Sequence, residues 1–158
     1  MSIPVFGMSD PDFRIALRKT RRAIIPIGSL EQHGAHLPVS TDSLISEYIA
    51  RMLAERTKSF VLPVMTFGVS FEHRPMFNVS VKHGSLTNLL SDACESLAEN
   101  GIGQIILLNG HHGNMGALQY VSQQVSAAGG SATRTNSAHT KPPTRVHAIH
   151  YWQVLDHE

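Results

Sequence analysis

The sequence lacks features that several classes of protein require. Cys94 is the only cysteine among 158 residues, which excludes a disulfide within the chain and is compatible with a reducing cytoplasm. No apolar run approaches the roughly 18 residues of a membrane-spanning helix. The N-terminal stretch carries its acidic residues before its basic ones, unlike a secretory signal. A formal net charge of +1 provides no basic stripe for nucleic acid. We therefore expect a cytoplasmic protein that binds neither membranes nor nucleic acid.

The composition is otherwise that of an ordinary globular protein, apart from its histidines. Apolar residues make up 42% of the chain and charged residues 16%, and the length suits a single domain over residues 1–158. Ten histidines stand beside the single cysteine. A transition-metal site in this chain would therefore use imidazole and carboxylate ligands, not thiolates.

Apolar runs of strand length alternate with amphipathic helical patterns along the chain. This alternation predicts an α/β fold with three layers (α/β/α) around a largely parallel sheet. Pro63 weakens the second strand, and the Gly-, Ser-, Thr- and Pro-rich residues 129–144 indicate a flexible loop. We expect strands at 22–28, 60–66, 104–109 and 145–152, and helices at 10–20, 43–57, 86–100 and 115–128, the last two with Ser85 and Asn114 as N-caps.

Polar clusters follow three of these segments, where open α/β sheets bind their ligands. In the first cluster, Glu31 and His33 are two residues apart and face the same way in an extended backbone. A carboxylate and an imidazole on one face suit Zn²⁺, Mn²⁺ or Fe²⁺. Asp42 either caps the following helix or bridges two metal ions, and its neighbours favour the bridge. His36 is interpreted as an ordinary loop histidine.

The other two clusters contribute different candidates. The strand at 104–109 leads directly into Gly-His-His-Gly, where one of His111 and His112 can face inward as a ligand. The segment 68–73 contains Ser70, but it lacks the closing glycine of a nucleophile elbow, so a serine hydrolase is a weak alternative. Cys94 is expected to be a buried small hydrophobe.

The three clusters together resemble the signature blocks of the creatininase family of metal-dependent amidohydrolases. The first block is the specific one, and agreement extends over roughly residues 20–128. The matching segments are PIGSLEQHGAHLP at 26–38 followed by Thr41-Asp42, GVSFEH at 68–73 and LNGHHGN at 108–114, with VHAIHYW at 146–152 similar to the family strand that follows.

The resemblance implies a creatininase-like fold, usually a hexamer, with a pair of divalent metal ions (Zn, Mn or Fe) that activate water to hydrolyse a non-peptide C–N bond. Family members act on creatinine, on a formamidopyrimidine nucleotide or on a redox-cofactor precursor peptide. The implied substrate is therefore a small molecule, either a cyclic amide or a formamide. Carried over by motif, the metal ligands are Glu31, His33, Asp42 and His111, and the substrate-side residues are Ser70, Glu72, His73 and His112, with Glu72 and His73 as catalytic candidates.

Two departures from the family pattern affect this interpretation. Creatininase itself takes a glutamate ligand two residues after the histidine of the third block, where this chain has Gly113. Relatives with glycine there use a carboxylate from a later block, and family members are considerably longer. We therefore expect a C-terminally truncated family domain, and a non-catalytic metal-binding or assembly subunit stays as the alternative to an enzyme.

Overall fold

The structure is a computed structural model that describes residues 3–130 and 144–153. Its centre is a five-stranded sheet in the order β1-β3-β2-β4-β5, with every neighbouring pair parallel. This arrangement confirms the predicted α/β class with a parallel sheet. The strands are β1 Ile3–Pro4, β2 Arg22–Ile27, β3 Phe60–Val61, β4 Gln104–Asn109 and β5 Arg145–His150.

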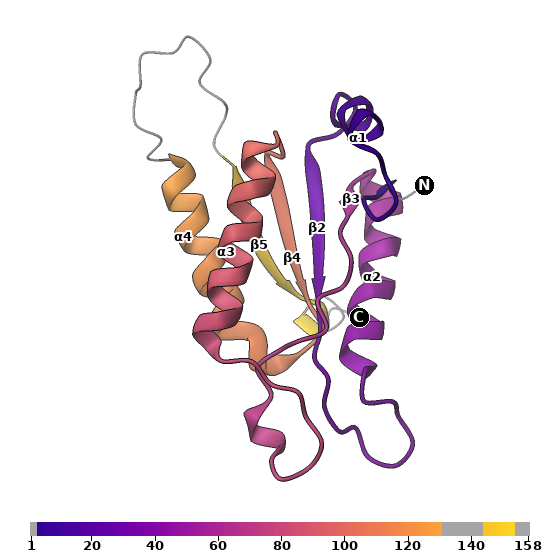
Figure 1. The fold of residues 1–158 in the computed structure, drawn as a ribbon, viewed down its shortest axis with the longest axis vertical. Coiled ribbons are helices and arrows are strands. Elements are labelled where there is room, and N and C mark those ends of the chain that lie inside the picture. The colour runs from indigo at the N-terminus through magenta and orange to yellow at the C-terminus, as the bar shows by residue number, and fades with distance from the viewer. Residues whose placement is uncertain (1–2, 131–143, 154–158) are drawn as a thin grey trace.

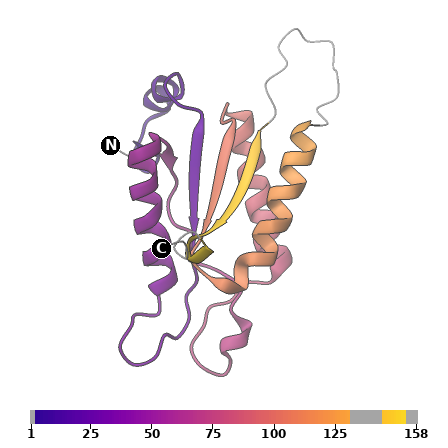
Figure 2. The same cartoon turned by 180° about the vertical axis from the view of Figure 1, so that it is seen from behind.

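Helices cover both faces of the sheet and give the predicted three layers (Figures 1 and 2). One face is covered by α2, which packs chiefly on β2, while α3 and α4 pack against one another on the other face. No helix among residues 3–130 and 144–153 is both long and apolar enough to cross a membrane. The helices are α1 Asp10–Leu17, α2 Thr41–Thr57, α3 His83–Glu99 and α4 Met115–Gly130.

The two central strands, β2 and β4, are apolar on both faces because each face lies under helices. Successive side chains of a strand point to opposite faces. In β2, Ile25 joins the core shared with α3 and α4, whereas Ile24 joins the smaller core under α2. Leu107 and Leu108 of β4 divide in the same way. The sheet centre is thereby fixed in register, and the residues that follow β2 and β4 emerge side by side.

Several expected boundaries differ from those observed. The second strand was expected over 60–66, but β3 ends at Val61, because Pro63 has no N–H to donate to the ladder. Ser85 as an N-cap is wrong, since α3 already begins at His83. Asn114 does not cap α4 either, because its side chain bonds to Val69 and Gly28 instead. Of the predicted loop 129–144, residues 131–143 lie outside the described part of the chain.

Two long loops leave the carboxyl end of the sheet and pair with one another. One follows β2 and the other precedes α3, and both extend beyond the strands at the same end of the molecule (Figure 1). The Gln32 N–H donates to the Phe77 carbonyl and the Val79 N–H to the Leu30 carbonyl, each at 2.8 Å. This pairing places a short 3-10 helix, Phe71–His73, beside the residues that follow β2.

Candidate metal centre

Two acidic residues and one histidine from distant parts of the sequence meet at the carboxyl edge of the sheet. Glu31 lies in the loop after β2, Asp42 in the first turn of α2, and His111 two residues after β4. Each offers one ligand atom, and these atoms lie within 4.8 Å of one another. All three residues are buried, with exposed fractions of 3%, 8% and 4%. Buried carboxylates require a positive partner, and among the described residues no lysine or arginine is recorded in an ion pair with either one.

Asp42 directs its two carboxylate oxygens to two different histidines. Oδ1 lies 3.0 Å from His33 Nε2, and Oδ2 lies 2.8 Å from His111 Nδ1. The alternative role of an N-cap does not describe this side chain, since α2 begins at Thr41 with Ser40 as the N-cap residue. The structure therefore brings together all four residues that the family resemblance marks as ligands.

The ring nitrogens of the two histidines show which atoms are free to bind a cation. His33 Nδ1 lies 3.1 Å from the Glu31 carbonyl oxygen, and His111 Nε2 lies 2.8 Å from the Val69 carbonyl oxygen. A carbonyl oxygen only accepts, so each of these nitrogens carries a proton. The remaining nitrogen of each ring faces carboxylate oxygens, which also only accept. Each ring must then either take a second proton or share a cation with the carboxylates.

The pKa of His111 reflects the same arrangement. Burial by itself lowers this pKa, because a charged ring loses its hydration. The hydrogen bonds to Asp42 and to the Val69 carbonyl, with the negative charges of Glu31 and Asp42, outweigh burial and raise the pKa above its usual value. The surroundings of the ring therefore favour positive charge at this point.

Glu31 has two further partners that the sequence analysis missed or assigned differently. Ser29 Oγ donates to Glu31 Oε2 at 2.8 Å, and His73 Nε2 lies 3.0 Å from Oε1. His73 was considered a catalytic candidate, whereas here it touches a candidate ligand. Ser29 could have been found, since it stands two residues before Glu31 and faces the same way in an extended chain. The role of Gln32, whose amide contacts His73, had no such signal.

Glycine is required at position 113 because the Val69 backbone lies close to it. A Cβ built on Gly113 would overlap the Val69 carbonyl oxygen and would lie 2.6 Å from His111 Nε2 and 2.9 Å from Glu72 Oε1. A glutamate at this position is therefore incompatible with the observed backbone. The Glu72 carboxylate, whose side chain is 53% exposed, lies on this side of His111 at 3.6 Å from Nε2.

Two asparagines that were missed as functional residues support the His111 loop. Asn109 Oδ1 accepts from the His111 N–H at 3.0 Å, and Asn109 Nδ2 donates to His150 Nδ1 at 2.9 Å. Burial and the nearby charge of His112 lower the pKa of His150, which agrees with an imidazole that accepts a hydrogen bond. Asn114 Oδ1 accepts from the Val69 N–H at 2.9 Å. These bonds hold the Val69 carbonyl and His111 in a fixed relative position.

The remaining candidates lie around this centre. His112 is exposed, and its ring stacks on Trp152 with centroids 6.1 Å apart. Ser70 is fully buried, and its Oγ has no hydrogen-bond partner among the described residues. A nucleophilic serine needs a base within hydrogen-bond reach, so the geometry gives the serine-hydrolase alternative no support. His36 is exposed, as expected for a loop histidine.

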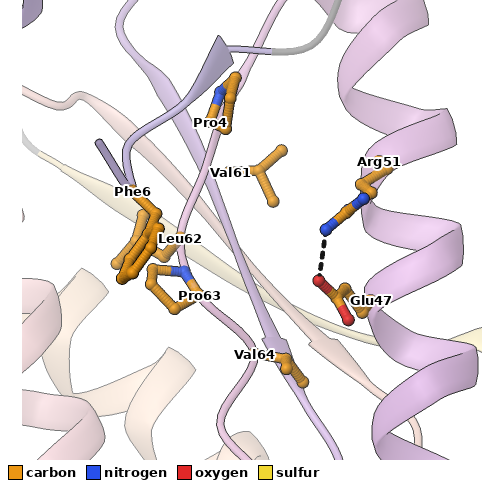
Figure 3. Close-up of a pocket in the computed structure, with 8 residues that line it drawn as sticks. All are labelled: Pro4, Phe6, Glu47, Arg51, Val61, Leu62, Pro63 and Val64. Atoms are coloured by element: carbon orange, nitrogen blue, oxygen red, sulfur yellow. Dashed lines mark hydrogen bonds and ion pairs between the residues drawn. The ribbon is translucent and has the colours of Figure 1, made fainter. Parts of the chain in front are cut away.

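Surface hollows also lie away from the candidate centre. A hollow of about 410 Å³ lies between the β1–β3 edge and α2, where Figure 3 shows Phe6, Leu62 and Pro63 opposite the ion pair between Glu47 and Arg51. A larger hollow of about 760 Å³ is lined chiefly by apolar side chains of α2, with Leu108 of β4 and Ile149 of β5. Neither contains a candidate ligand, and the chemistry-bearing residues are concentrated at the carboxyl edge of the sheet.

A parallel α/β sheet with a buried carboxylate–imidazole cluster beyond its strand ends is typical of α/β proteins that bind a ligand or metal ion at this edge. Comparison with known proteins defines the family. The model of the family Creatininase, described as creatinine amidohydrolase, matches residues 7–157. The chain therefore belongs to the creatininase family of amidohydrolases, as its three signature blocks predicted.

Individual relatives differ in their named activities. The chain is similar to the mycofactocin precursor peptide peptidase of Mycobacterium tuberculosis, with 34% identity over 128 residues covering 73% of this chain and 51% of the peptidase. It is also similar to a 2-amino-5-formylamino-6-ribosylaminopyrimidin-4(3H)-one 5'-monophosphate deformylase of Methanococcus voltae, with 30% identity over 108 residues covering 63% of this chain and 38% of the deformylase.

The fold agrees with solved structures of the family. The solved structure named Creatininase Mn superimposes with a TM-score of 0.79 at 21% sequence identity, covering 99% of this chain and 61% of that one. At this identity the likeness concerns the fold. The aligned part of the chain spans about half the length of the M. tuberculosis peptidase.

Proposed function

We propose that the chain carries the metal centre of an amidohydrolase that uses activated water to cleave a C–N bond. The observation that supports this most concerns the two rings of His33 and His111. In each ring one nitrogen donates to a backbone carbonyl, and the other nitrogen, His33 Nε2 or His111 Nδ1, faces a carboxylate oxygen. Such a donor set fits a divalent cation, because a cation replaces the proton that each ring otherwise needs.

The residues that would hold the cation follow from the contacts. Glu31, Asp42 and His111 provide one set of three ligand atoms. His33 lies on the other oxygen of Asp42, so Asp42 is positioned to bridge a second ion. Carboxylate and imidazole ligands suit Zn, Mn or Fe, and Mn appears in the name of one structural relative. We propose that the site would hold two divalent ions, with Asp42 as a ligand shared between them.

A divalent ion held there would supply Lewis-acid chemistry, which polarises an amide carbonyl and makes water more acidic. The chain's own residues then hold the reacting groups and move the proton. Glu72 is a half-exposed carboxylate whose Oε1 lies 3.6 Å from His111 Nε2. We assign it the role of accepting a proton from water and passing it to the leaving nitrogen. His111 is fixed by Val69 and Asp42 and would hold a divalent ion through Nδ1.

The substrate class follows from the family at a coarse level. The relatives named above comprise a peptide peptidase and a deformylase of a nucleotide, and the family description adds creatinine. The substrates in these names share a carbonyl group bonded to nitrogen, as an amide or a formamide. We propose a small cyclic amide or a formamide as the substrate, with a formamidopyrimidine nucleotide as one candidate. A cytoplasmic location and a homo-oligomer, a hexamer by resemblance, stay predictions.

A non-catalytic metal-binding or assembly subunit is the second candidate function. Gly113 favours it, because no side-chain carboxylate stands at this position and the Val69 carbonyl leaves no room for one. The three ligands Glu31, Asp42 and His111 would still hold an ion. The two candidates differ in turnover, not in metal binding.

The test is a hydrolysis screen on the metal-loaded chain. Formate release from formamides and ring opening of cyclic amides are measured with and without a chelator, and with the variant Glu72→Gln. An amidohydrolase shows turnover that the chelator abolishes and that falls in Glu72→Gln by roughly the 10²–10⁴-fold attributed to acid–base catalysis. Metal binding without turnover on any substrate supports the subunit. Turnover that survives complete removal of metal overturns both.

A further inference from the structure

A series of polar contacts runs from the Gly34 backbone through Gln32 and His73 to the Glu31 carboxylate. The Gly34 N–H donates to Gln32 Oε1 at 3.0 Å, which identifies the other end of that amide as its NH₂ group. This group lies 3.1 Å from His73 Nδ1. His73 Nε2 in turn lies 3.0 Å from Glu31 Oε1.

The two neighbours of His73, Gln32 and Glu31, fit the same tautomer of its ring. The Gln32 NH₂ group only donates, so His73 Nδ1 must be the bare, accepting nitrogen. A neutral ring with a bare Nδ1 carries its proton on Nε2, which lies 3.0 Å from the Glu31 carboxylate, an acceptor. A neutral imidazole satisfies both contacts, and no second proton or cation is needed.

His73 therefore differs from the two histidines assigned as ligands. In His33 and His111, the nitrogen that contacts Asp42 is the one that does not bond to a backbone carbonyl. In His73, the nitrogen that faces the carboxylate is the donor. The partners of the rings therefore distinguish His33 and His111, which present a bare nitrogen to the carboxylates, from His73, which presents an N–H group.

We infer that Gln32 fixes His73 as an Nε2–H donor, so that His73 is a positioning residue for Glu31 and not a metal ligand. The metal-related part of this inference rests on the proposed function. Ser29 Oγ bonds to the other oxygen of the same carboxylate at 2.8 Å. Glu31 then has a side-chain partner at each oxygen, and neither partner is one of the residues that would hold the ion. Such outer partners commonly orient metal-binding groups.

The test is nitrogen NMR of the chain with ¹⁵N-labelled histidine, before and after addition of Zn²⁺. The His73 signals are assigned by their absence in His73→Gln. We expect an unprotonated Nδ1 and a protonated Nε2 in both spectra. An Nδ1-protonated ring before metal addition, or loss of the Nε2 proton on addition of Zn²⁺, overturns the inference.

Substitution of Gln32 tests the cause of the tautomer. Gln32→Glu keeps an acceptor for the Gly34 N–H but replaces the donor at His73 Nδ1 by an acceptor. We expect a proton to appear on Nδ1, whereas Gln119→Glu, the same change at an exposed residue of α4, leaves His73 unaltered. An unchanged His73 spectrum in Gln32→Glu means that Gln32 does not set the tautomer and overturns the inference.

Metal affinity separates failure of this inference from failure of the proposed function. His73→Gln keeps an N–H donor, whereas His73→Leu has none. We expect His73→Leu to weaken Zn²⁺ binding by roughly 10–100-fold, with His73→Gln restoring most of it. Equal losses in both variants overturn the positioning role while metal binding itself stands. If the unaltered chain binds no metal, the proposed function fails, and the NMR result still decides the tautomer.

Discussion

Asp42 Oδ2 and His111 Nδ1 lie 2.8 Å apart although 69 residues separate them in the chain. The contact joins the first turn of α2 to the segment that leaves β4. It forms because β2 and β4 are adjacent parallel strands whose carboxyl ends open at the same edge. Gly110 permits it, since a Cβ there would overlap the Asp42 carbonyl oxygen. The fold of the sheet thereby determines which acid meets which imidazole.

Gly113→Ala is expected to destabilise the protein. The added methyl group would overlap the Val69 carbonyl oxygen, and overpacking of this kind typically costs about 1–3 kcal/mol in the free energy of unfolding. Urea denaturation measures the change. Gly84→Ala, near the start of α3 with open space around the new methyl group, is the matched control and should be neutral or stabilising by up to about 1 kcal/mol. Equal effects in the two variants would refute the close approach at Gly113.

Ser29→Ala is expected to weaken metal binding without removing a ligand. The substitution deletes the donor to Glu31 Oε2 and leaves that buried oxygen short of a partner. By analogy with other outer partners of metal sites, the affinity for Mn²⁺ should fall by roughly 10–100-fold. Calorimetric titration measures it. Ser122→Ala, which removes an exposed hydroxyl on α4, serves as the control and should bind as the unaltered chain does; an equal loss there would contradict a specific role for Ser29.

Cys94 is expected to make the folded protein less stable as the pH becomes alkaline. Burial, with a smaller contribution from the charge of Glu95, raises the pKa of this thiol to about 12 from 9.0. Between these two values the unfolded chain loses the thiol proton and the folded chain keeps it. The folded state then binds more protons, so the free energy of unfolding falls as pH rises above about 9.

The measurement for Cys94 is urea denaturation between pH 8 and 10.5. The slope of stability against pH should be shallower in Cys94→Ala than in the unaltered chain, whatever the two absolute stabilities are. The native thiol should also resist alkylation at pH 8, because the thiolate is the nucleophile. Rapid alkylation of the folded protein would show that the thiol is neither buried nor raised in pKa.

The sequence was sufficient for the layers and for four of the five strands, whereas the two-residue β1 was missed. The apolar runs at β2 and β4 and the amphipathic pattern of α2 are local signals, and each indicated the element observed. The boundaries were less predictable. The strand expected over 60–66 ends at Val61, yet the Met65 N–H still donates to the Pro26 carbonyl at 2.9 Å. The residues after Val61 therefore run beside β2 without forming a regular β-ladder, and no local sequence pattern predicts this arrangement.

The candidate centre could be predicted only in part, and for a physical reason. Glu31 and His33 were marked by alternation within one segment, and His111 by its position after a buried strand. The roles of Gln32, Asn109 and Asn114 depend on partners 41 to 86 residues distant in sequence. Such contacts arise from packing of the loops and not from spacing. The position of His73 beside Glu31 likewise follows from the pairing of two loops across the sheet edge.

The most direct test of the account is a calorimetric titration of the metal-free chain with Mn²⁺ and Zn²⁺, repeated on Asp42→Asn and His111→Gln. Asp42→Asn preserves side-chain shape and His111→Gln keeps a polar side chain of similar length, and His36→Ala, at an exposed histidine of the same loop as Glu31, is the control. Circular dichroism checks that each variant is folded. We expect tight binding by the unaltered chain and by His36→Ala, with losses in the two ligand variants larger than the roughly 10–100-fold cost of an outer partner. Unchanged affinity in folded Asp42→Asn and His111→Gln would contradict the assignment of this cluster as the metal centre.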